Sequence, residues 1–209
     1  MAMTKIELEQ GTDVWLQWRN AGIGASEAAS VLDKNPWCSS TMLLNKKLGT
    51  KAEKFSKLSQ TRMQRGRDLE PRIREIYTAF TGIKCEPVCC QSLEYPWMLA
   101  SLDGLSECGE IVVEIKAPNS ESHLKALNEN VPEHYYWQVL HQLVVTNARI
   151  GHYVSWCDAK QFLPEDQLAI VRVERDAEKE AYLVDRERQW WEWYTNQREI
   201  LQGLREEEV

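Results

Sequence analysis

Three residues with metal-site chemistry lie close together near the middle of the chain. Asp103 precedes a short segment with two glycines, Gly104 and Gly109, and a β-branched run then carries Glu114 and Lys116. The run predicts a strand, and residues two apart on a strand share one face, so these two side chains should point the same way. A turn at the glycines would bring the aspartate back beside them. Two carboxylates and an ammonium group can hold Mg²⁺ and activate water, which is the chemistry of a metal-dependent nuclease.

The same residues also have an ordinary interpretation, because Glu-x-Lys often lies on a solvated sheet face and Asp-Gly often marks only a turn. The surrounding sequence favours the metal site. Ile111, Val113 and Ile115 make the strand apolar, and Ala117-Pro118 ends it directly after the lysine. Charged groups on a buried strand need a partner or a coordinated ion, and a metal would supply one.

The composition indicates one soluble domain spanning residues 1–209. A chain of 209 residues with 43% apolar residues can form one full core but is short for two. No stretch approaches the roughly 20 apolar residues that cross a bilayer, and no apolar leader follows Met1, so we expect a cytoplasmic protein without a membrane contact. Six cysteines without a Cys-x-x-Cys pair predict reduced thiols rather than a disulfide framework or a thiolate metal site.

Positive charge is concentrated in one segment. The whole protein has a formal net charge of −7, yet residues 46–74 contain ten lysines and arginines and three acidic residues. A basic surface of this kind suits a nucleic-acid backbone even on an acidic protein. A solvated pair of helices would show the same excess, so charge alone leaves both interpretations open.

Glycine and proline positions and the spacing of apolar residues predict a helical N-terminal third, followed by strands and helices. The predicted helices cover residues 12–20, 26–32, 41–48, 69–80, 120–130 and 133–146, and a long amphipathic helix covers 176–208. The predicted strands cover 84–93, 98–102, 111–116, 149–157 and 168–174. This order favours an α/β fold with a central mixed sheet flanked by helices. Trp190, Trp191 and Trp193 on the last helix cannot all face one core, so one should pack against the sheet and another is available to a partner.

Five short motifs follow one another from the N-terminal region to residue 143. They are Arg19-Asn20-Ala21-Gly22-Ile23-Gly24-Ala25-Ser26-Glu27, Arg65-Gly66-Arg67-Asp68-Leu69-Glu70, Ser101-Leu102-Asp103-Gly104, Glu114-Ile115-Lys116-Ala117-Pro118 and Tyr135-Tyr136-Trp137-Gln138-Val139-Leu140-His141-Gln142-Leu143. In this order they resemble the motifs of the phage lambda exonuclease family, also called the YqaJ-type viral recombinases. The resemblance extends from about Trp15 to Thr146. One departure is Leu102, where the family often has proline before the aspartate.

The resemblance implies the restriction-endonuclease-like α/β core of PD-(D/E)xK nucleases. It implies an exodeoxyribonuclease that degrades one strand of linear double-stranded DNA from the 5′ end and leaves a 3′ overhang for single-strand annealing recombination. Mg²⁺ would be the cofactor, with two ions expected and Mn²⁺ able to replace them. A single-strand annealing protein would be the partner and a ring of three subunits the assembly, in the cytoplasm of a bacterial or phage-infected cell.

Two other functions remain open from the sequence. An endonuclease of the same fold would cut duplex DNA internally, and a recombination mediator without catalysis would only bind DNA. Residues that recognise a 5′ end would separate the exonuclease from the endonuclease. Intact Asp103, Glu114 and Lys116 argue against the mediator.

The resemblance also assigns roles around the metal. Asp103, Glu114 and the carbonyl oxygen of Ile115 would be metal ligands, while Lys116 would orient or deprotonate the attacking water and offset charge on the phosphate. Glu70 resembles a fourth carboxylate of the family, which would bind the second ion or organise water. An acidic residue at the start of a predicted helix is also favoured by the helix dipole alone, so Glu70 has two interpretations.

Three further residues resemble the family's pocket for the 5′-terminal phosphate: Arg19, Ser26 and Ser101. Ser26 opens a predicted helix, so it would be an N-cap by default, although free N–H groups at a helix start also bind anions. Gln138 would contact the substrate or bridge site residues, unless its amide only satisfies a buried backbone group.

Residues 61–67 correspond to a loop that enters the duplex in the family. Met63 is its apolar side chain, between Arg62 and Arg65. An inserted apolar side chain can offset the cost of unstacking bases, so Met63 is the candidate wedge. Packing of Met63 under the following helix is the ordinary alternative.

Overall fold

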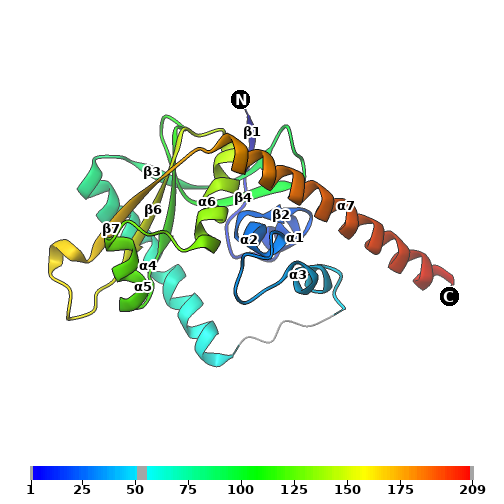
Figure 1. Cartoon of the computed structure of the whole chain (residues 1–209), viewed down its shortest axis with the longest axis horizontal. Coiled ribbons are helices and arrows are strands. Elements are labelled where there is room, and N and C mark those ends of the chain that lie inside the picture. The colour runs from blue at the N-terminus through cyan, green and yellow to red at the C-terminus, as the bar shows by residue number, and fades with distance from the viewer. Residues whose placement is uncertain (1, 51–55, 208–209) are drawn as a thin grey trace.

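A mixed β-sheet passes through the centre of the protein (Figure 1). The computed structural model describes residues 2–50 and 56–207, and in these ranges the sheet has seven strands. They are β1 (Met3–Ile6), β2 (Ile23–Gly24), β3 (Cys85–Ser92), β4 (Met98–Ser106), β5 (Ile111–Lys116), β6 (Ile150–Trp156) and β7 (Leu168–Glu174). Lys51 and Lys54 of the basic segment, and residue 208 of the predicted last helix, lie outside the described ranges.

The strands pair in the order β1-β3-β4-β5-β6-β7, and β2 pairs with β4 beside this path. β5 runs parallel to β6, and β2 runs parallel to β4. The other pairs are antiparallel. The predicted α/β fold with a central mixed sheet is therefore confirmed, while the short edge strands β1 and β2 were missed.

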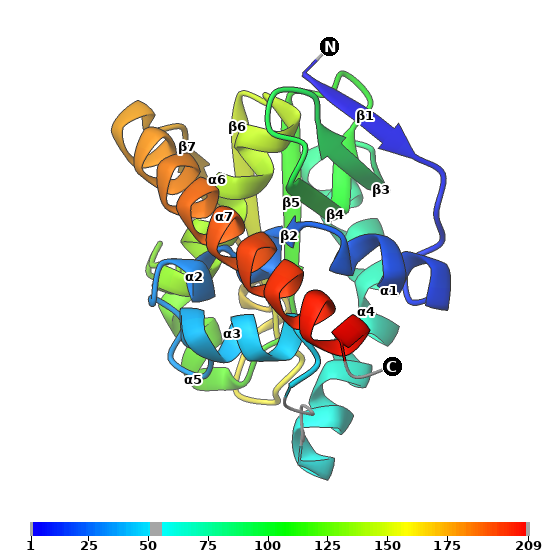
Figure 2. The same cartoon turned by 90° about the vertical axis from the view of Figure 1, so that its right-hand side faces the viewer.

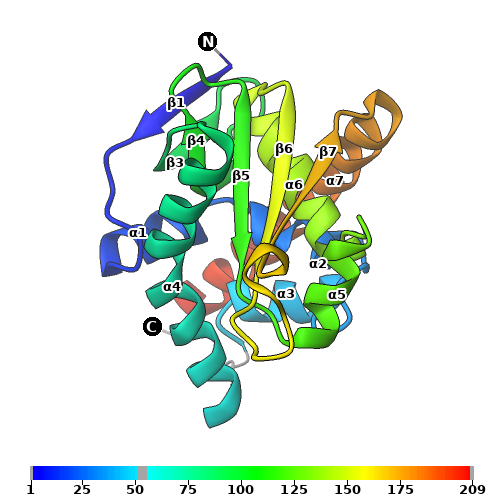
Figure 3. The ribbon, with the colours of Figure 1, turned by 90° about the vertical axis from the view of Figure 1, so that its left-hand side faces the viewer.

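Helices cover both faces of the sheet. They are α1 (Asp13–Asn20), α2 (Ala28–Val31), α3 (Ser40–Lys47), α4 (Lys57–Thr81), α5 (Ser120–Leu127), α6 (Glu133–Thr146) and α7 (Ala177–Glu207), with 3₁₀ turns η1 (Ala25–Glu27) and η2 (Pro164–Asp166). α4 packs on one face, and α5 and α6 pack on the other (Figure 3). The predicted helix 133–146 and strand 168–174 match α6 and β7. None of the described helices is long and apolar enough to span a membrane.

Alternate residues of β5 contribute to the cores on the two faces. Val113 and Ile115 pack with Ile73 and Tyr77 of α4, and all four are buried. Val112 packs in the core on the α6 side. Burial on both faces explains why this strand is a nearly continuous β-branched run. It also means that charged residues placed on β5 must find partners inside the protein.

α4 begins at Lys57, twelve residues before the predicted start, so the prediction that residues 61–67 form a loop was wrong. Gly66 and Pro71 are poor helix residues and led the prediction to place a helix start between them. Both positions lie on the surface of the helix, where an added Cβ at Gly66 would meet nothing within 4 Å. Ser56 caps the helix by accepting a hydrogen bond from the Ser59 amide at 3.1 Å.

β4 continues through Asp103 and Gly104 to Ser106, so the predicted turn at Gly104 was also wrong. The chain reverses later, where Gly109 has φ +75°. Gly104 instead makes room for β3, because a Cβ on it would lie 2.7 Å from the Cys85 sulfur. A glycine inside a strand often marks this kind of close approach.

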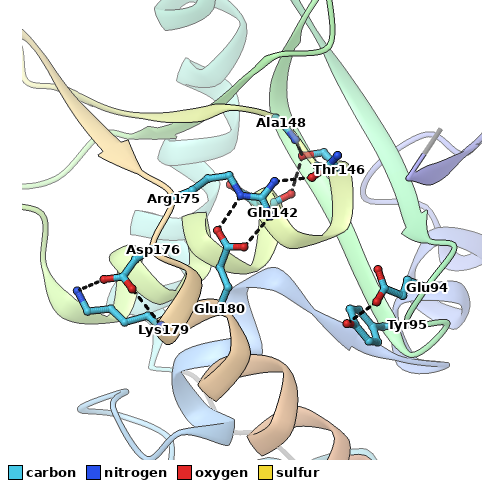
Figure 4. A network of polar contacts seen from close by, with 10 residues as sticks. Glu94, Tyr95, Gln142, Thr146, Ala148, Arg175, Asp176, Lys179 and Glu180 are labelled. Atoms are coloured by element: carbon cyan, nitrogen blue, oxygen red, sulfur yellow. Dashed lines mark hydrogen bonds and ion pairs between the residues drawn. The ribbon is translucent and has the colours of Figure 1, made fainter.

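Polar contacts fix the end of α6 to the start of α7 (Figure 4). The Thr146 hydroxyl donates to the Gln142 carbonyl at 2.8 Å, which closes the last turn of α6. Arg175, two residues before α7, donates to the two carboxylate oxygens of Glu180 at 2.8 and 2.6 Å and to the Asn147 side chain at 2.5 Å. Bidentate pairs of this kind restrict orientation as well as distance.

α7 crosses α2 and α3 (Figure 2) and is anchored by buried groups. Glu187 and His141 of α6 are both fully buried, with 2.8 Å between Glu187 Oε1 and His141 Nδ1. The Trp190 indole donates to the Ser40 carbonyl at 3.2 Å, and Trp193 is 39% exposed. Trp190 therefore packs mainly against α2 and α3 rather than against the face of the sheet, and Trp193 stays accessible.

Candidate active site

The candidate site lies where β4 and β5 separate. Their pairing ends at Gly104 opposite Val113, and the same register would place Asp103 opposite Glu114 at the open end. There the Ile115 amide donates to Asp103 Oδ2 at 2.8 Å instead of to a strand carbonyl. The separation of the strands therefore puts the two predicted carboxylates together at a fork.

Glu114 is 1% exposed and accepts hydrogen bonds at both carboxylate oxygens. Lys116 and Gln138 donate to Oε1, the latter at 2.7 Å, and Gln142 donates to Oε2 at 2.5 Å. The predicted common orientation of Glu114 and Lys116 is present. Gln138 reaches the site, and the bond that its amide makes is to a carboxylate rather than to a backbone group.

Gln142 is a site residue that the sequence reasoning missed. It lies four residues after Gln138, so both amides lie on one face of α6 and reach the same carboxylate. The Gln-x-x-x-Gln spacing was a usable signal. The spacing indicates a site only when α6 is known to pack over Glu114 of β5, and that packing is tertiary structure, which the sequence pattern did not predict.

The carboxylates disfavour one another's charge. Burial and the nearby Glu114 raise the pKa of Asp103 well above its ordinary value, although the side chain keeps some contact with solvent. Burial also raises the pKa of Glu70, with a further contribution from Glu114. Burial alone would lower the pKa of Lys116, but Glu114 and Asp103 more than offset it and raise that pKa. Lys116 forms an ion pair with Glu114 and so supplies positive charge that compensates these carboxylates.

Glu70 lies well inside α4 rather than at a helix start. The helix-dipole interpretation of this residue was therefore wrong, because the dipole acts within the first turn. One turn later, Arg74 donates through Nε to the Asp103 carbonyl at 2.7 Å. α4 is thus attached to β4 at the fork, and the charges of Lys116 and Glu114 act on the pKa of its Glu70 carboxyl group.

The donor set fits a divalent cation. Asp103 and Glu114 offer hard carboxylate oxygens, and their mutual repulsion is relieved when a cation binds. Among the residues that the structure describes, no group of three or more His, Cys, Asp and Glu side chains converges on one point. Mg²⁺ commonly uses one or two carboxylates and completes its shell with water and substrate phosphate, so two are sufficient. The Ile115 carbonyl lies between Glu114 and Lys116 in the chain and stays the proposed third oxygen.

A second group of predicted residues is brought together by Trp15 of α1. Arg19 donates to the Ser26 hydroxyl, and its guanidinium carbon lies 5.1 Å from the centre of the Trp15 ring. The Trp15 indole donates to the Ser101 hydroxyl at 2.7 Å. Since Ser101 precedes Asp103 by two residues on β4, this group, the Arg19 cluster, is directly connected to the fork.

Ser26 is not an N-cap, because it lies inside η1 and Gly24 precedes that turn. Glu27 performs the capping and accepts a hydrogen bond from the Gly24 amide at 2.9 Å. The absence of a side chain at Gly24 leaves room for Arg19, whose Nε would lie 3.3 Å from an added Cβ. The Ser26 hydroxyl is therefore free of capping and available to the guanidinium or to an anion.

Met63 lies on the N-terminal half of α4 and is 45% exposed, so it does not pack under a helix as the ordinary alternative required. Arg65 forms an ion pair with Asp158 at 2.9 Å and reaches the Ala117 carbonyl at 3.4 Å. Arg62 is exposed on the same helix. The three predicted residues therefore stand on a projecting helix, not on a loop (Figure 3).

The domain described as the YqaJ-like viral recombinase domain matches residues 14–149, which is more than half of the chain. The chain belongs to this family. The resemblance found in the five motifs is thereby confirmed. No curated protein matches the chain.

Solved structures of similar fold support the same assignment. An alkaline exonuclease from Laribacter hongkongensis, LHK-Exo, is 23% identical with a TM-score of 0.81, covering 95% of this chain and 100% of that one. LHK-Exo in complex with dAMP gives 24% identity and the same TM-score and coverage. A phage-related exonuclease from Haemophilus somnus 129PT is 11% identical with a TM-score of 0.65, covering 88% of this chain and 96% of that one. At these identities the likeness shows that the YqaJ-family chain has the exonuclease fold, in agreement with the predicted fold class.

Proposed function

We propose that the protein is a Mg²⁺-dependent 5′→3′ exonuclease that degrades one strand of linear double-stranded DNA and leaves a 3′ overhang. Family membership and the exonuclease fold support a nuclease of the lambda exonuclease type. The observation that carries the finer proposal is the position of two groups on β4. Asp103 is the first carboxylate of the fork, and Ser101, which bonds the Trp15 indole of the Arg19 cluster, lies two residues before it on the same strand.

The chain's own residues suit hydrolysis of a phosphodiester. Asp103, Glu114 and the Ile115 carbonyl would hold the metal, which supplies a polarised phosphate and an activated water when bound. The raised pKa of Lys116 keeps its ammonium group protonated, so in this arrangement it orients water and offsets phosphate charge. Gln138 and Gln142 hold Glu114 in place.

The Arg19 cluster would select the 5′ end. A guanidinium and two hydroxyls are suitable donors for a terminal phosphate dianion, and the Trp15 ring fixes the direction of Arg19. LHK-Exo binds dAMP, a nucleotide with a phosphate monoester. A chain with the same fold and such a cluster is expected to accept similar groups here.

The function is tested by supplying purified protein with linear duplex DNA and with covalently closed circular duplex in Mg²⁺. Release of nucleotides from the linear substrate alone, and none in EDTA, is the expected result. Cutting of the closed circle would support the endonuclease instead. Binding of both substrates without hydrolysis would support the non-catalytic mediator.

The pKa directions predict how Mg²⁺ binding depends on pH. Asp103 and Glu70 have raised pKa values, so protons compete with the metal, and the metal binds the deprotonated carboxylates. Mg²⁺ should therefore bind more weakly at pH 6 than at pH 8 and should release protons on binding. Titration calorimetry in two buffers of different ionisation enthalpy measures both quantities. Asp103→Asn should bind weakly at either pH, and equal affinity of the wild-type protein at both pH values would contradict the assignment.

Met63 stays the proposed wedge for strand separation, now on the projecting half of α4. Met63→Ala should slow degradation of blunt duplex but spare a duplex whose terminal pairs are mismatched, since unstacking costs a few kcal/mol per step. Leu58→Ala is the matched control, because Leu58 is 61% exposed on the same helix. Equal slowing of both substrates by Met63→Ala would remove the wedge role. Arg62 and Arg65 are proposed to contact the DNA backbone beside it.

Family membership also supports three proposals about context. The assembly would be a ring of three subunits, the partner a single-strand annealing protein, and the location the cytoplasm of a bacterial or phage-infected cell. Two Mg²⁺ ions, replaceable by Mn²⁺, would act, with Glu70 serving the second. Light scattering of the purified protein tests the ring directly.

A further inference from the structure

A row of aromatic rings extends from the surface to the fork. Trp37, in the segment between α2 and α3, contacts His134 of α6 edge-on with 5.0 Å between ring centres. The ring centres of His134 and Tyr135 lie 4.0 Å apart, and the Tyr135 ring stacks on that of Tyr153 of β6 with 5.5 Å between centres. The Lys116 ammonium nitrogen lies 5.2 Å from the centre of the Tyr135 ring. Two ring contacts and one cation–π contact therefore connect the exposed Trp37 to the candidate catalytic Lys116.

Trp37 is 70% exposed, and polar contacts connect the segment that carries it to α2 and α6. The Trp37 amide donates to the Asn35 side chain at 3.0 Å, and Asn35 donates to the Ser30 hydroxyl at 3.0 Å. Lys34 forms an ion pair with Glu133, the first residue of α6, at 3.3 Å. The exposed indole is thus presented next to α6 by a backbone segment that is hydrogen-bonded and ion-paired to its surroundings.

His134, the central ring of the row, is uncharged. Burial and the charge of Lys116 lower its pKa, so the imidazole is neutral at neutral pH. Its Nε2 has no hydrogen-bond partner among the described residues. Neutral rings with a cation at their inner end match the two parts of a nucleotide, because a base stacks on a ring face and a phosphate is attracted to the ammonium group.

We propose that Trp37, His134 and Tyr135 form a stacking track for bases of the single DNA strand that enters the site, a role that rests on the proposed nuclease function. The exposed Trp37 face takes a base, and the inner rings guide the adjacent nucleotides toward Lys116. Flat aromatic surfaces stack with all four bases, so the track increases affinity for the strand without sequence preference. A protein partner is disfavoured as the occupant because the row ends at the charged site and not on an apolar surface.

The test measures binding in EDTA, where the proposed metal-dependent cleavage cannot occur. A 5′-phosphorylated single-stranded oligonucleotide of about 10 nucleotides is titrated intact and with one abasic position moved along its length. For the wild-type protein, one or two abasic positions should weaken binding roughly 5-fold to 100-fold. Trp37→Leu, which keeps an exposed apolar side chain but no ring, should lose affinity for the intact strand by a similar factor and should no longer sense the outermost of these positions.

Two further variants make the result specific. Trp37→Phe retains a ring and should restore most of the difference between intact and abasic strands. Phe80→Leu makes the matched aromatic-to-leucine change at a 75% exposed position near the far end of α4, and it should change nothing. If Trp37→Leu binds intact and abasic strands like the wild-type protein, the track is wrong. Linear-duplex degradation by the wild-type protein in Mg²⁺ is scored separately, so loss of the track and loss of the nuclease proposal give different results.

Discussion

Asp103→Asn should lower the rate of DNA degradation in Mg²⁺ at least about a thousandfold, because it removes a charged ligand worth several kcal/mol of charge stabilisation at the phosphate. The substitution keeps the shape of the side chain, and its amide oxygen can still accept the hydrogen bond from the Ile115 amide. Binding of duplex ends should persist. Initial rates on 5′-labelled linear duplex measure the loss.

Asp103→Asn should not lose stability, so its loss of activity can be distinguished from an effect on folding. The pKa of Asp103 is raised in the folded protein, so the folded state holds the proton more tightly than the unfolded state. A raised carboxyl pKa therefore costs stability as the pH rises above the unfolded value, and a neutral Asn avoids that cost. In EDTA at pH 8 the variant should melt at or above the wild-type temperature, and the difference should shrink toward acidic pH. A variant that retained wild-type turnover would remove Asp103 from the metal site.

Glu114 provides the contrasting case. Glu114→Ala should also abolish cleavage, but it leaves Gln138, Gln142 and Lys116 without their shared acceptor. Buried donors without partners are costly, so this variant should also melt earlier. Both variants should lose activity, although Asp103→Asn should be at least as stable as the wild-type protein and Glu114→Ala less stable. Misfolding alone would not produce this combination.

The part of the site predicted from the sequence is the part set by local periodicity. Glu114 and Lys116 share a face because strand residues two apart do, and the β-branched residues from Ile111 to Ile115 predict the strand. The features that were missed depend on neighbours distant in the sequence. Gly104 was predicted to form a turn, but it lies within β4, where the absence of a side chain leaves room for the Cys85 sulfur of β3.

α4 shows the same limit in a helix. Local propensity placed the start beside Pro71, but the helix continues back to Lys57, since Pro71 is exposed and Gly66 only partly buried, where the carbonyl freed by proline can meet water. Gln142 was missed for a related reason. A glutamine on a helix gains a role only when the helix covers a buried carboxylate, and the packing of α6 on β5 decides that.

Arg19→Ala should slow digestion of 5′-phosphorylated duplex about 10-fold to 100-fold, while 5′-hydroxyl duplex is slowed much less. The guanidinium would make charge-assisted hydrogen bonds to the terminal phosphate, and such bonds contribute about 1.5–3 kcal/mol. The Trp15 ring and the Ser26 hydroxyl hold the guanidinium ready, so little orientation entropy is lost on binding. The ratio of initial rates on the two substrates is the measurement.

The control for Arg19→Ala is Arg62→Ala, which removes an equal charge from the exposed face of α4. Loss of a general backbone contact should slow both substrates alike and leave their ratio unchanged. Arg19→Lys keeps the charge without the planar fork and should recover only part of the preference for 5′-phosphate. If Arg19→Ala slows both ends equally, the cluster that joins α1 to β4 is a general DNA contact or a structural link, and the polarity of the enzyme must arise elsewhere.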